Sequence, residues 1–335
     1  MAARRDAVAL LRDLVAFDTT SRNSNLDLIR YVESYLKDCG IAARLIPSDD
    51  GRKANLFATA GPAREGGIVL SGHTDVVPVD GQDWSTAPFV LTERDGRLYG
   101  RGSADMKGFI ACALAMMPEF AAMDLDRPVH IALSYDEEVG CLGVGRMIDA
   151  ILAELPRPAA VVVGEPTSMQ IASAHKGICA MTTTVRGREA HSSRPQDGVN
   201  AIAAAGGLVA ELYRLCDELA ATDRDERFEP RHTTFNVGTI AGGDAINIIA
   251  RECVVKWEFR PIPGADPDRI AARVDAFVDT VLLPPMRAVD PAASVETVRD
   301  LLVPPLDSPP DSPAEALARR ATGLNSAGTI AFVTE

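Results

Sequence analysis

The chain has 335 residues, of which 47 are acidic and 34 basic, so its formal net charge is −13. At about 150 residues per domain this length predicts two domains. Its 47% apolar and 24% charged residues exclude global disorder, and the acidic balance argues against a protein that binds nucleic acid or an anionic membrane. We therefore expect a globular protein that handles metals or cationic small molecules, and neither nucleic acid nor a membrane as partner.

Cysteine and apolar patterning indicate a cytoplasmic protein. The six cysteines lie far apart and no two form a CxxC pair, which argues against a disulfide scaffold. The apolar stretch Val8–Phe17 is interrupted by Arg12 and Asp13. We therefore predict an amphipathic first helix there, and neither a signal peptide nor a membrane span.

Short apolar runs alternate with helical stretches in the first half of the chain. We predict helices over Ala7–Phe17, Leu26–Cys39, Gly108–Phe120 and Gly145–Leu155, and buried strands over Gly67–Ser71, Val129–Tyr135 and Ala160–Gly164. Gly40 follows the second helix at a typical C-cap position. This alternation predicts βαβ units, and hence an α/β domain with a mostly parallel sheet and helices on both faces.

The pattern changes after about Lys176. We predict strands over Cys179–Arg186, Thr233–Ile240 and Cys253–Arg260, and helices over Asn200–Leu219, Asp266–Val281 and Ala293–Leu302. A β-α-β-β-α order is typical of a small α+β domain with an antiparallel sheet. We therefore predict that residues 178–287 form an inserted domain, which interrupts an α/β domain made of residues 1–177 and 288–335.

Histidine and acidic residues gather in four clusters, each after a strand-like run or in a glycine-rich loop. The clusters are His73-Thr74-Asp75, Asp105 in GRGSADMKG, Asp136-Glu137-Glu138, and Glu165 in GEPT. Sites in open α/β sheets form at the carboxyl ends of strands, and His, Asp and Glu are ligands of hydrolytic zinc sites. The four clusters together predict a metal site at this edge of the sheet.

The spacing within the clusters suits metal chemistry. His73 and Asp75 are two residues apart and point the same way in an extended chain, so the carboxylate can hold the imidazole. Glu137 and Glu138 are adjacent and diverge, so one can bind metal while the other faces a water molecule. Asp105 lies among small residues, where a carboxylate can approach two ions that activate a bridging water.

Each cluster taken singly also fits an ordinary structural role. His73 with Asp75, or Asp105, fits a capped turn; adjacent glutamates are usually solvated; and Glu165 before a proline fits a helix N-terminus. All of these explanations would have to hold at once to exclude a site. Competing motifs are missing from the sequence, which contains no HExxH, GxSxG or GxxxxGK[ST].

Seven motifs follow one another between residue 70 and about residue 263. They are SGHTDVVP, GRGSADMKG, YDEEVG, GEPT, AHSSRP, GGDAINII and FRPIP. In this order they resemble the dinuclear-zinc amidohydrolases and exopeptidases, a family that includes acetylornithine deacetylase, succinyl-diaminopimelate desuccinylase, aminoacylases and glutamate carboxypeptidases. AHKGI and SSRPQDGVNAI resemble the acetylornithine deacetylase branch. The resemblance implies a zinc-dependent hydrolase of linear amides, with N2-acetyl-L-ornithine of arginine biosynthesis as the leading substrate.

The resemblance also implies a ligand set for two zinc ions, with Co²⁺ as a substitute. His73 and Glu165 would bind one ion, Asp105 would bridge the two, and Glu138 would bind the second. Asp75 would orient His73, and the peptide bond after Asp105 would be cis.

Further roles carry over from the same family. Glu137 would be the general base, and the inserted ferredoxin-like domain would act as a lid and pair two subunits into a homodimer. His191 would reach the partner's active site and stabilise the developing oxyanion. Asn247 and Arg260 would contact substrate, with the Arg260 guanidinium suited to a carboxylate; an ion pair between Arg260 and Glu258 is the alternative.

One feature departs from the family pattern. The second zinc would also take a histidine beyond a TEA-like stretch, but no histidine follows His232. We therefore expect the His73–Glu165 site to be kept and the Glu138 site to bind weakly. The alternative hypotheses are a succinyl-diaminopimelate desuccinylase or broader N-acyl amino acid amidohydrolase and, from another class, a catalytically impaired form or a non-catalytic binding scaffold.

Overall fold

The computed structural model describes residues 5–154 and 156–334, and these divide into two compact units. The first unit contains the chain up to Ile171, together with Pro309–Ala327 and Thr334. The second contains Ala172–Ser308 and Gly328–Val333. Each unit has a hydrophobic core of its own.

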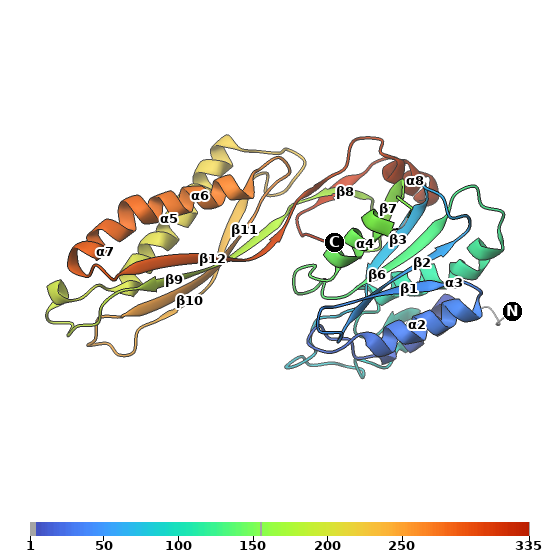
Figure 1. The fold of residues 1–335 in the computed structure, drawn as a ribbon, viewed down its shortest axis with the longest axis horizontal. Helices are drawn as coiled ribbons and strands as arrows, with labels where there is room; N and C mark the ends of the chain where they lie inside the picture. The colour runs from blue at the N-terminus through green and yellow to red at the C-terminus, as the bar shows by residue number, and fades with distance from the viewer. Residues whose placement is uncertain (1–4, 155, 335) are drawn as a thin grey trace. The chain divides into compact units, whose positions relative to one another are not determined.

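The first unit is built on a five-stranded sheet in the order β1-β2-β6-β3-β7 (Figure 1). Its strands are β1 (Ala43–Pro47), β2 (Ala54–Ala60), β3 (Ile68–His73), β6 (Val129–Ser134) and β7 (Ala160–Val163). β3 pairs in parallel with β6 and β7, whereas β2 pairs antiparallel with β6 and β1. The α/β class is confirmed, and the sheet is mixed.

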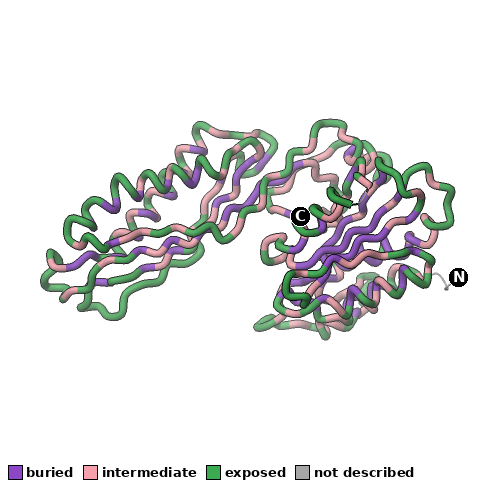
Figure 2. The backbone as a smooth tube through the Cα atoms, viewed as in Figure 1, coloured by how far each residue is buried: buried purple, intermediate pink, exposed green. Residues whose placement is uncertain are grey.

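Helices cover both faces of this sheet. Helices α1 (Ala7–Ala16), α2 (Leu26–Asp38) and α3 (Lys107–Ala122) pack on one face and α4 (Val144–Glu154) on the other. Successive side chains of β2 point to opposite faces of the sheet. Leu56 and Ala58 belong to the core under α1–α3, whereas Phe57 packs with Met147 of α4. Figure 2 shows the central strands buried along most of their length.

The helices and strands predicted for this unit are confirmed to within two residues. The last residue of the fourth predicted helix, Leu155, lies outside the described residues. Gly40 has φ +79° after α2, as a C-cap position requires. The unit also contains the hairpin of β4 (Thr92–Arg94) and β5 (Arg97–Tyr99), and helix α8 (Pro313–Thr322).

The second unit contains a four-stranded antiparallel sheet in the order β10-β11-β9-β12. Its strands are β9 (Ile178–Arg186), β10 (Thr234–Gly242), β11 (Glu252–Arg260) and β12 (Ser294–Val303). Its helices are α5 (Ala201–Thr222), α6 (Pro267–Phe277), the π-helical turn η2 (Val278–Leu282) and α7 (Leu283–Val289). With the fourth strand beside the first, this is the ferredoxin-like βαββαβ arrangement.

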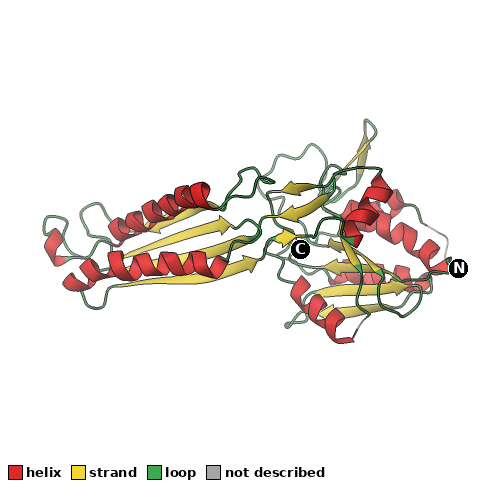
Figure 3. Cartoon of the chain, turned by 90° about the horizontal axis from the view of Figure 1, so that it is seen from above, coloured by secondary structure: helices red, strands yellow, loops and turns green. Residues whose placement is uncertain are grey.

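The helices of the second unit run along its strands (Figure 3) and pack on the aromatic side chains of β11. Leu208 and Leu212 of α5 and Val274 of α6 share one core with Trp257 and Phe259. The unit also contains a three-stranded sheet of β13 (Leu306–Asp307), β8 (Ala172–His175) and β14 (Gly328–Ile330), and the 3₁₀ turn η1 (Pro195–Asp197).

The predicted helix over Ala293–Leu302 was wrong, because these residues form β12. The strand pairs with β9 from Ser294 opposite Arg186 to Val303 opposite Ile178. Its β-branched residues favour a strand, and the free edge of β9 supplies the backbone partners. The boundaries at 177/178 and 287/288 stay a prediction. Since β12 belongs to this sheet, we propose that the inserted domain extends to Ser308.

Candidate active site

His73 is the last residue of β3, is fully buried, and has acceptors at both ring nitrogens. Its Nδ1 lies 3.0 Å from the backbone oxygen of Asp75, and its Nε2 lies 3.0 Å from Oδ1 of Asp105 and 3.7 Å from Oε1 of Glu165. Burial alone would lower the pKa of His73, but Asp105 and Asp75 outweigh it and raise the pKa to about 12. The imidazole is thus fixed with Nε2 directed at carboxylates.

Four carboxylates surround this imidazole. The ligand atoms of His73, Asp105 and Glu138 lie within 4.8 Å of one another, as do those of His73, Glu137 and Glu165. Burial, together with the charge of Asp105, raises the pKa of Glu138 to about 7 and also raises the pKa of Glu165. An imidazole among crowded carboxylates is the donor set of divalent metal ions, whose charge offsets the repulsion. The residues present therefore fit a metal centre.

The sheet explains why these residues meet. β3 ends at His73, β6 is followed by Glu137 and Glu138, and β7 is followed by Glu165. These three strands run parallel, so their carboxyl ends lie at one edge. Asp105 stands just before α3, and its side chain is 49% exposed, so the cluster opens to solvent there.

Close backbone packing supports the cluster at two glycines. A Cβ on Gly72 would lie 2.8 Å from Cε of Met106, and one on Gly164 would lie 1.9 Å from the ring of Phe109. Met106 follows the cis peptide bond of Asp105, which confirms that prediction. The Met106 sulfur also accepts a hydrogen bond from the backbone N–H of His73 at 3.4 Å. An alanine at Gly164 would overlap the Phe109 ring, whereas an alanine at Gly72 would require the flexible end of Met106 to shift.

Asp75 connects the clusters. Its carboxylate accepts hydrogen bonds from the Ser21 hydroxyl at 2.7 Å and from the backbone N–H groups of Glu137 at 3.1 Å and Glu138 at 3.2 Å. Burial would raise its pKa, but His73 and these donors lower it. The carboxylate lies 3.6 Å from Nδ1 of His73, farther than the backbone oxygen of the same residue. Both groups of Asp75 therefore lie beside Nδ1 of His73.

Sequence reasoning missed several side chains around the cluster. The hydroxyl of Thr334 donates to Glu165 at 3.0 Å, across 169 residues of chain. Lys107 is fully buried and donates to the backbone oxygen of Phe17 at 2.9 Å, and burial lowers its pKa to about 7 against the charges of Asp18 and Asp75. Lys107 could have been noticed as the single cation of an apolar helix. Thr334 carries no such signal.

In the second unit, His191 and Asn247 lie on paired segments. His191 forms an antiparallel bridge with Ile248, and the backbone N–H of Ser192 donates to the oxygen of Asn247 at 3.0 Å. Both residues are exposed. The backbone N–H of Ser193 donates to Nδ1 of His191 at 3.2 Å, and the Ser193 hydroxyl lies 2.8 Å from the same nitrogen. The structure therefore brings these two predicted site residues together.

Arg260, the third predicted residue of this unit, is engaged by a carboxylate of its own strand. Its Nε lies 3.0 Å and its Nη2 3.3 Å from the two carboxylate oxygens of Glu258. The alternative that the sequence left open is therefore present in the structure. The Arg260 side chain is 31% exposed.

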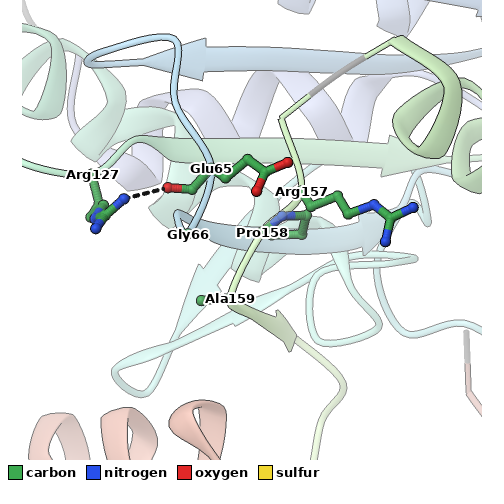
Figure 4. Close-up of a pocket in the computed structure, with 6 residues that line it drawn as sticks. All are labelled: Glu65, Gly66, Arg127, Arg157, Pro158 and Ala159. Atoms are coloured by element: carbon green, nitrogen blue, oxygen red, sulfur yellow. Dashed lines mark hydrogen bonds between the residues drawn. The ribbon is translucent and has the colours of Figure 1, made fainter.

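A pocket of about 450 Å³ lies at the amino ends of β3, β6 and β7 (Figure 4). It is lined by Glu65, Gly66, Arg127, Arg157, Pro158 and Ala159. Arg127 donates to the backbone oxygen of Glu65 at 2.8 Å, and the lining residues include no member of the acidic cluster. The pocket and the candidate active site therefore occupy opposite edges of the sheet.

An α/β sheet with a histidine and several carboxylates at the carboxyl ends of its strands is an arrangement that suits metal-dependent hydrolases. The model of peptidase family M20/M25/M40 matches residues 69–329. The chain is similar to acetylornithine deacetylase from Myxococcus xanthus, with 41% identity over 274 residues that make up 80% of this chain and 70% of the relative. This chain belongs to peptidase family M20/M25/M40 and is a metal-dependent hydrolase of amide bonds.

Solved structures share the fold. An M20 family metallo-carboxypeptidase from Sulfolobus solfataricus superposes with a TM-score of 0.75 at 17% identity, over 98% of this chain and 87% of that one. A dinuclear metal binding peptidase of the same family from Bacillus subtilis has a TM-score of 0.63 at 12% identity, over 98% and 82%. At these identities the likeness concerns the fold alone. Among the described residues, no helix is both long and apolar enough to cross a membrane.

Proposed function

We propose that this protein removes the acetyl group from N2-acetyl-L-ornithine, a step of arginine biosynthesis. The observation that carries the proposal is the 41% identity to an acetylornithine deacetylase over 80% of the chain. The cluster around His73 adds to it, because this cluster offers the ligand types that amide hydrolysis at a metal centre needs. We further propose a cytoplasmic enzyme, in keeping with a biosynthetic role.

The metal ligands in this proposal are His73, Asp105, Glu138 and Glu165. The ligand atom of Asp105 lies near those of His73 and Glu138, which supports the proposal that Asp105 would bridge two ions. When bound, zinc ions lower the pKa of a water molecule and polarise the carbonyl of the amide. The nature of the metal is part of the proposal.

Glu137 is the proposed general base. Its carboxylate takes a proton from the water that attacks the acetyl carbonyl and returns it to the departing α-amine, so that acetate and ornithine leave. The Glu137 backbone N–H is held by Asp75, which fixes the start of the side chain. Glu138 on the next residue diverges from it, so one carboxylate can handle protons while the other binds metal.

His191, Asn247 and Arg260 are the proposed substrate-binding residues of the second unit. The N–H at Nε2 of His191 would donate to the oxyanion as it develops, acting from the partner subunit of a homodimer. Arg260 would bind the substrate carboxylate by its guanidinium, in competition with Glu258.

The experiment is a comparison of two substrates with the purified, zinc-loaded protein. We expect acetate release from N2-acetyl-L-ornithine to exceed succinate release from N-succinyl-L,L-diaminopimelate, and prior chelation of the metal to abolish both. Preferential release of succinate would contradict the acetyl substrate and favour the desuccinylase. No turnover of either substrate, with zinc bound, would favour a binding scaffold.

A further inference from the structure

Two adjacent glutamates of the proposed site are attached by their backbone to one carboxylate. The N–H groups of Glu137 and Glu138 both donate to Asp75, one to each carboxylate oxygen. The hydroxyl of Ser21 donates to Asp75 Oδ2 at 2.7 Å, and both of these side chains are buried. Oδ2 therefore accepts from both the Ser21 hydroxyl and the Glu138 N–H, and Oδ1 accepts from the Glu137 N–H.

A lysine closes these contacts into a ring. The ammonium of Lys53 contacts the carboxylate of Asp136 and the backbone oxygen of Ser21. The side chains of Lys53 and Asp136 are only 17% and 15% exposed, so solvent weakens this ion pair little. Because Asp136 directly precedes Glu137, the contacts lead from Ser21 through Asp75, Glu137, Asp136 and Lys53 back to Ser21.

The backbone at Asp136 shows why such support is needed. Asp136 has φ +60°, which lies in the left-handed region that residues other than glycine rarely adopt. A residue persists there when its surroundings hold it. The ion pair with Lys53 supports this conformation at Asp136, together with the hydrogen bond from the Leu142 N–H to the Asp136 backbone oxygen at 3.0 Å.

We infer that Lys53 and Ser21 are positioning residues, which direct the carboxylates of Glu137 and Glu138 through Asp136 and Asp75. The inference rests on the proposed function in one respect, namely the roles given to the two glutamates. Neither residue touches His73 or the bound substrate in this scheme. Their effect passes through the backbone of residues 136–138.

Charge removal at Lys53 tests the ring. We expect Lys53→Met and Asp136→Asn each to lower kcat for N2-acetyl-L-ornithine roughly tenfold, as loss of an outer-shell partner does, with KM within about twofold of wild type. The double variant should be no worse than Lys53→Met alone, because Lys53→Met already removes the contact with Asp136. Lys53→Arg should recover most of the activity, and Lys37→Met, at an exposed lysine of α2, is the matched control.

Zinc affinity gives a readout that needs no turnover. Competition titration should show zinc binding weakened roughly tenfold in Lys53→Met and Asp136→Asn, because Glu138 is displaced, and unchanged in Lys37→Met. Wild-type kcat and wild-type zinc affinity in Lys53→Met would overturn the inference, even if its melting temperature fell. If the wild-type protein binds zinc but releases no acetate, only the proposed function is refuted. The zinc affinities of the variants then still test whether Lys53 positions the glutamates.

A second pair of variants keeps the test decisive if Lys53→Met fails to fold. Ser21→Ala removes the hydroxyl that holds Asp75, whereas Ser21→Thr keeps it. We expect weakened zinc binding in the alanine variant and recovery in the threonine variant. Equal zinc affinity in both would overturn the positioning role of Ser21.

Discussion

The first unit holds its candidate site from several sides, whereas the second unit presents its candidate residues to solvent. His73 and Asp75 are buried, and Asp75 alone accepts three hydrogen bonds from residues outside β3. In the second unit, His191 and Asn247 are exposed and Arg260 is occupied by Glu258. Burial fixes geometry but couples the site to folding, whereas exposed residues contribute little to the stability of the fold.

The comparison predicts different consequences for substitutions in the two units. Changes at the buried cluster should affect metal binding or stability as well as turnover. Changes at the exposed residues should affect turnover alone. Glu137, the proposed general base, is a third case, because its side chain would take part in the reaction without binding the metal.

Glu137→Gln should have the largest effect. The amide cannot accept the proton, so we expect kcat to fall by about 10²- to 10⁴-fold while zinc content per chain stays at the wild-type value. Steady-state kinetics and elemental analysis measure the two quantities, and Glu93→Gln in the exposed β4 strand is the control. Loss of zinc in the variant would instead make Glu137 a ligand, a role that its distance to His73 and Glu165 also allows.

His191→Ala should remove the oxyanion donor and lower kcat by about 10²- to 10³-fold. Because the side chain is exposed, we expect the free energy of unfolding to change by less than about 0.5 kcal/mol. Denaturant unfolding and kinetics on one preparation check both statements. A parallel loss of stability would show that the contrast between the two units does not hold at this residue.

Mixing variants tests whether His191 acts across a dimer. Subunits carrying Glu137→Gln and subunits carrying His191→Ala are each inactive in this scheme, but a mixed dimer regains one complete site. After unfolding and refolding together in equal amounts, the mixture should recover about a quarter of wild-type activity. No recovery would place His191 in the site of its own subunit.

Asp75→Asn should weaken zinc binding by about 10- to 100-fold, the usual effect of removing a partner that orients a ligand. The NH2 group of the new asparagine is a donor, and it would face a group that now donates to the Asp75 carboxylate. A buried polar group left without a partner costs about 1–3 kcal/mol of unfolding free energy. Zinc titration and urea unfolding measure these effects, with Asp83→Asn at an exposed position as the control. Wild-type zinc affinity would refute the role given to Asp75.

Gly164→Ala should have the smallest effect, and chiefly on stability. The new methyl would meet the ring of Phe109 at 1.9 Å, and such overpacking costs about 1–3 kcal/mol of unfolding free energy. Gly145→Ala in α4 is the matched control, because nothing lies within 4 Å of its added Cβ. That control should be neutral or stabilising, since alanine favours a helix. Equal stability of the two variants would contradict the close packing at Gly164.

Local patterns were sufficient for much of the first unit. Its predicted helices and strands agree with the structure to within two residues, because long amphipathic stretches and buried apolar runs have distinct periods. Because the strands were predicted correctly, His73, Glu137 and Glu165 were also predicted at strand ends. β12 shows the limit, since Val295, Thr297 and Leu301 fit a short helix or a strand, and only its pairing with β9 decides between them.

The sequence by itself therefore determined the family, the α/β class and the candidate metal ligands, because the motifs are short and their order is diagnostic. Only the tertiary structure decided that Lys53 and Ser21 close a ring with Asp75, and that Arg260 is paired with Glu258. The ring joins residues up to 83 positions apart. Such contacts arise from the packing of whole elements, and no local period in the chain records them.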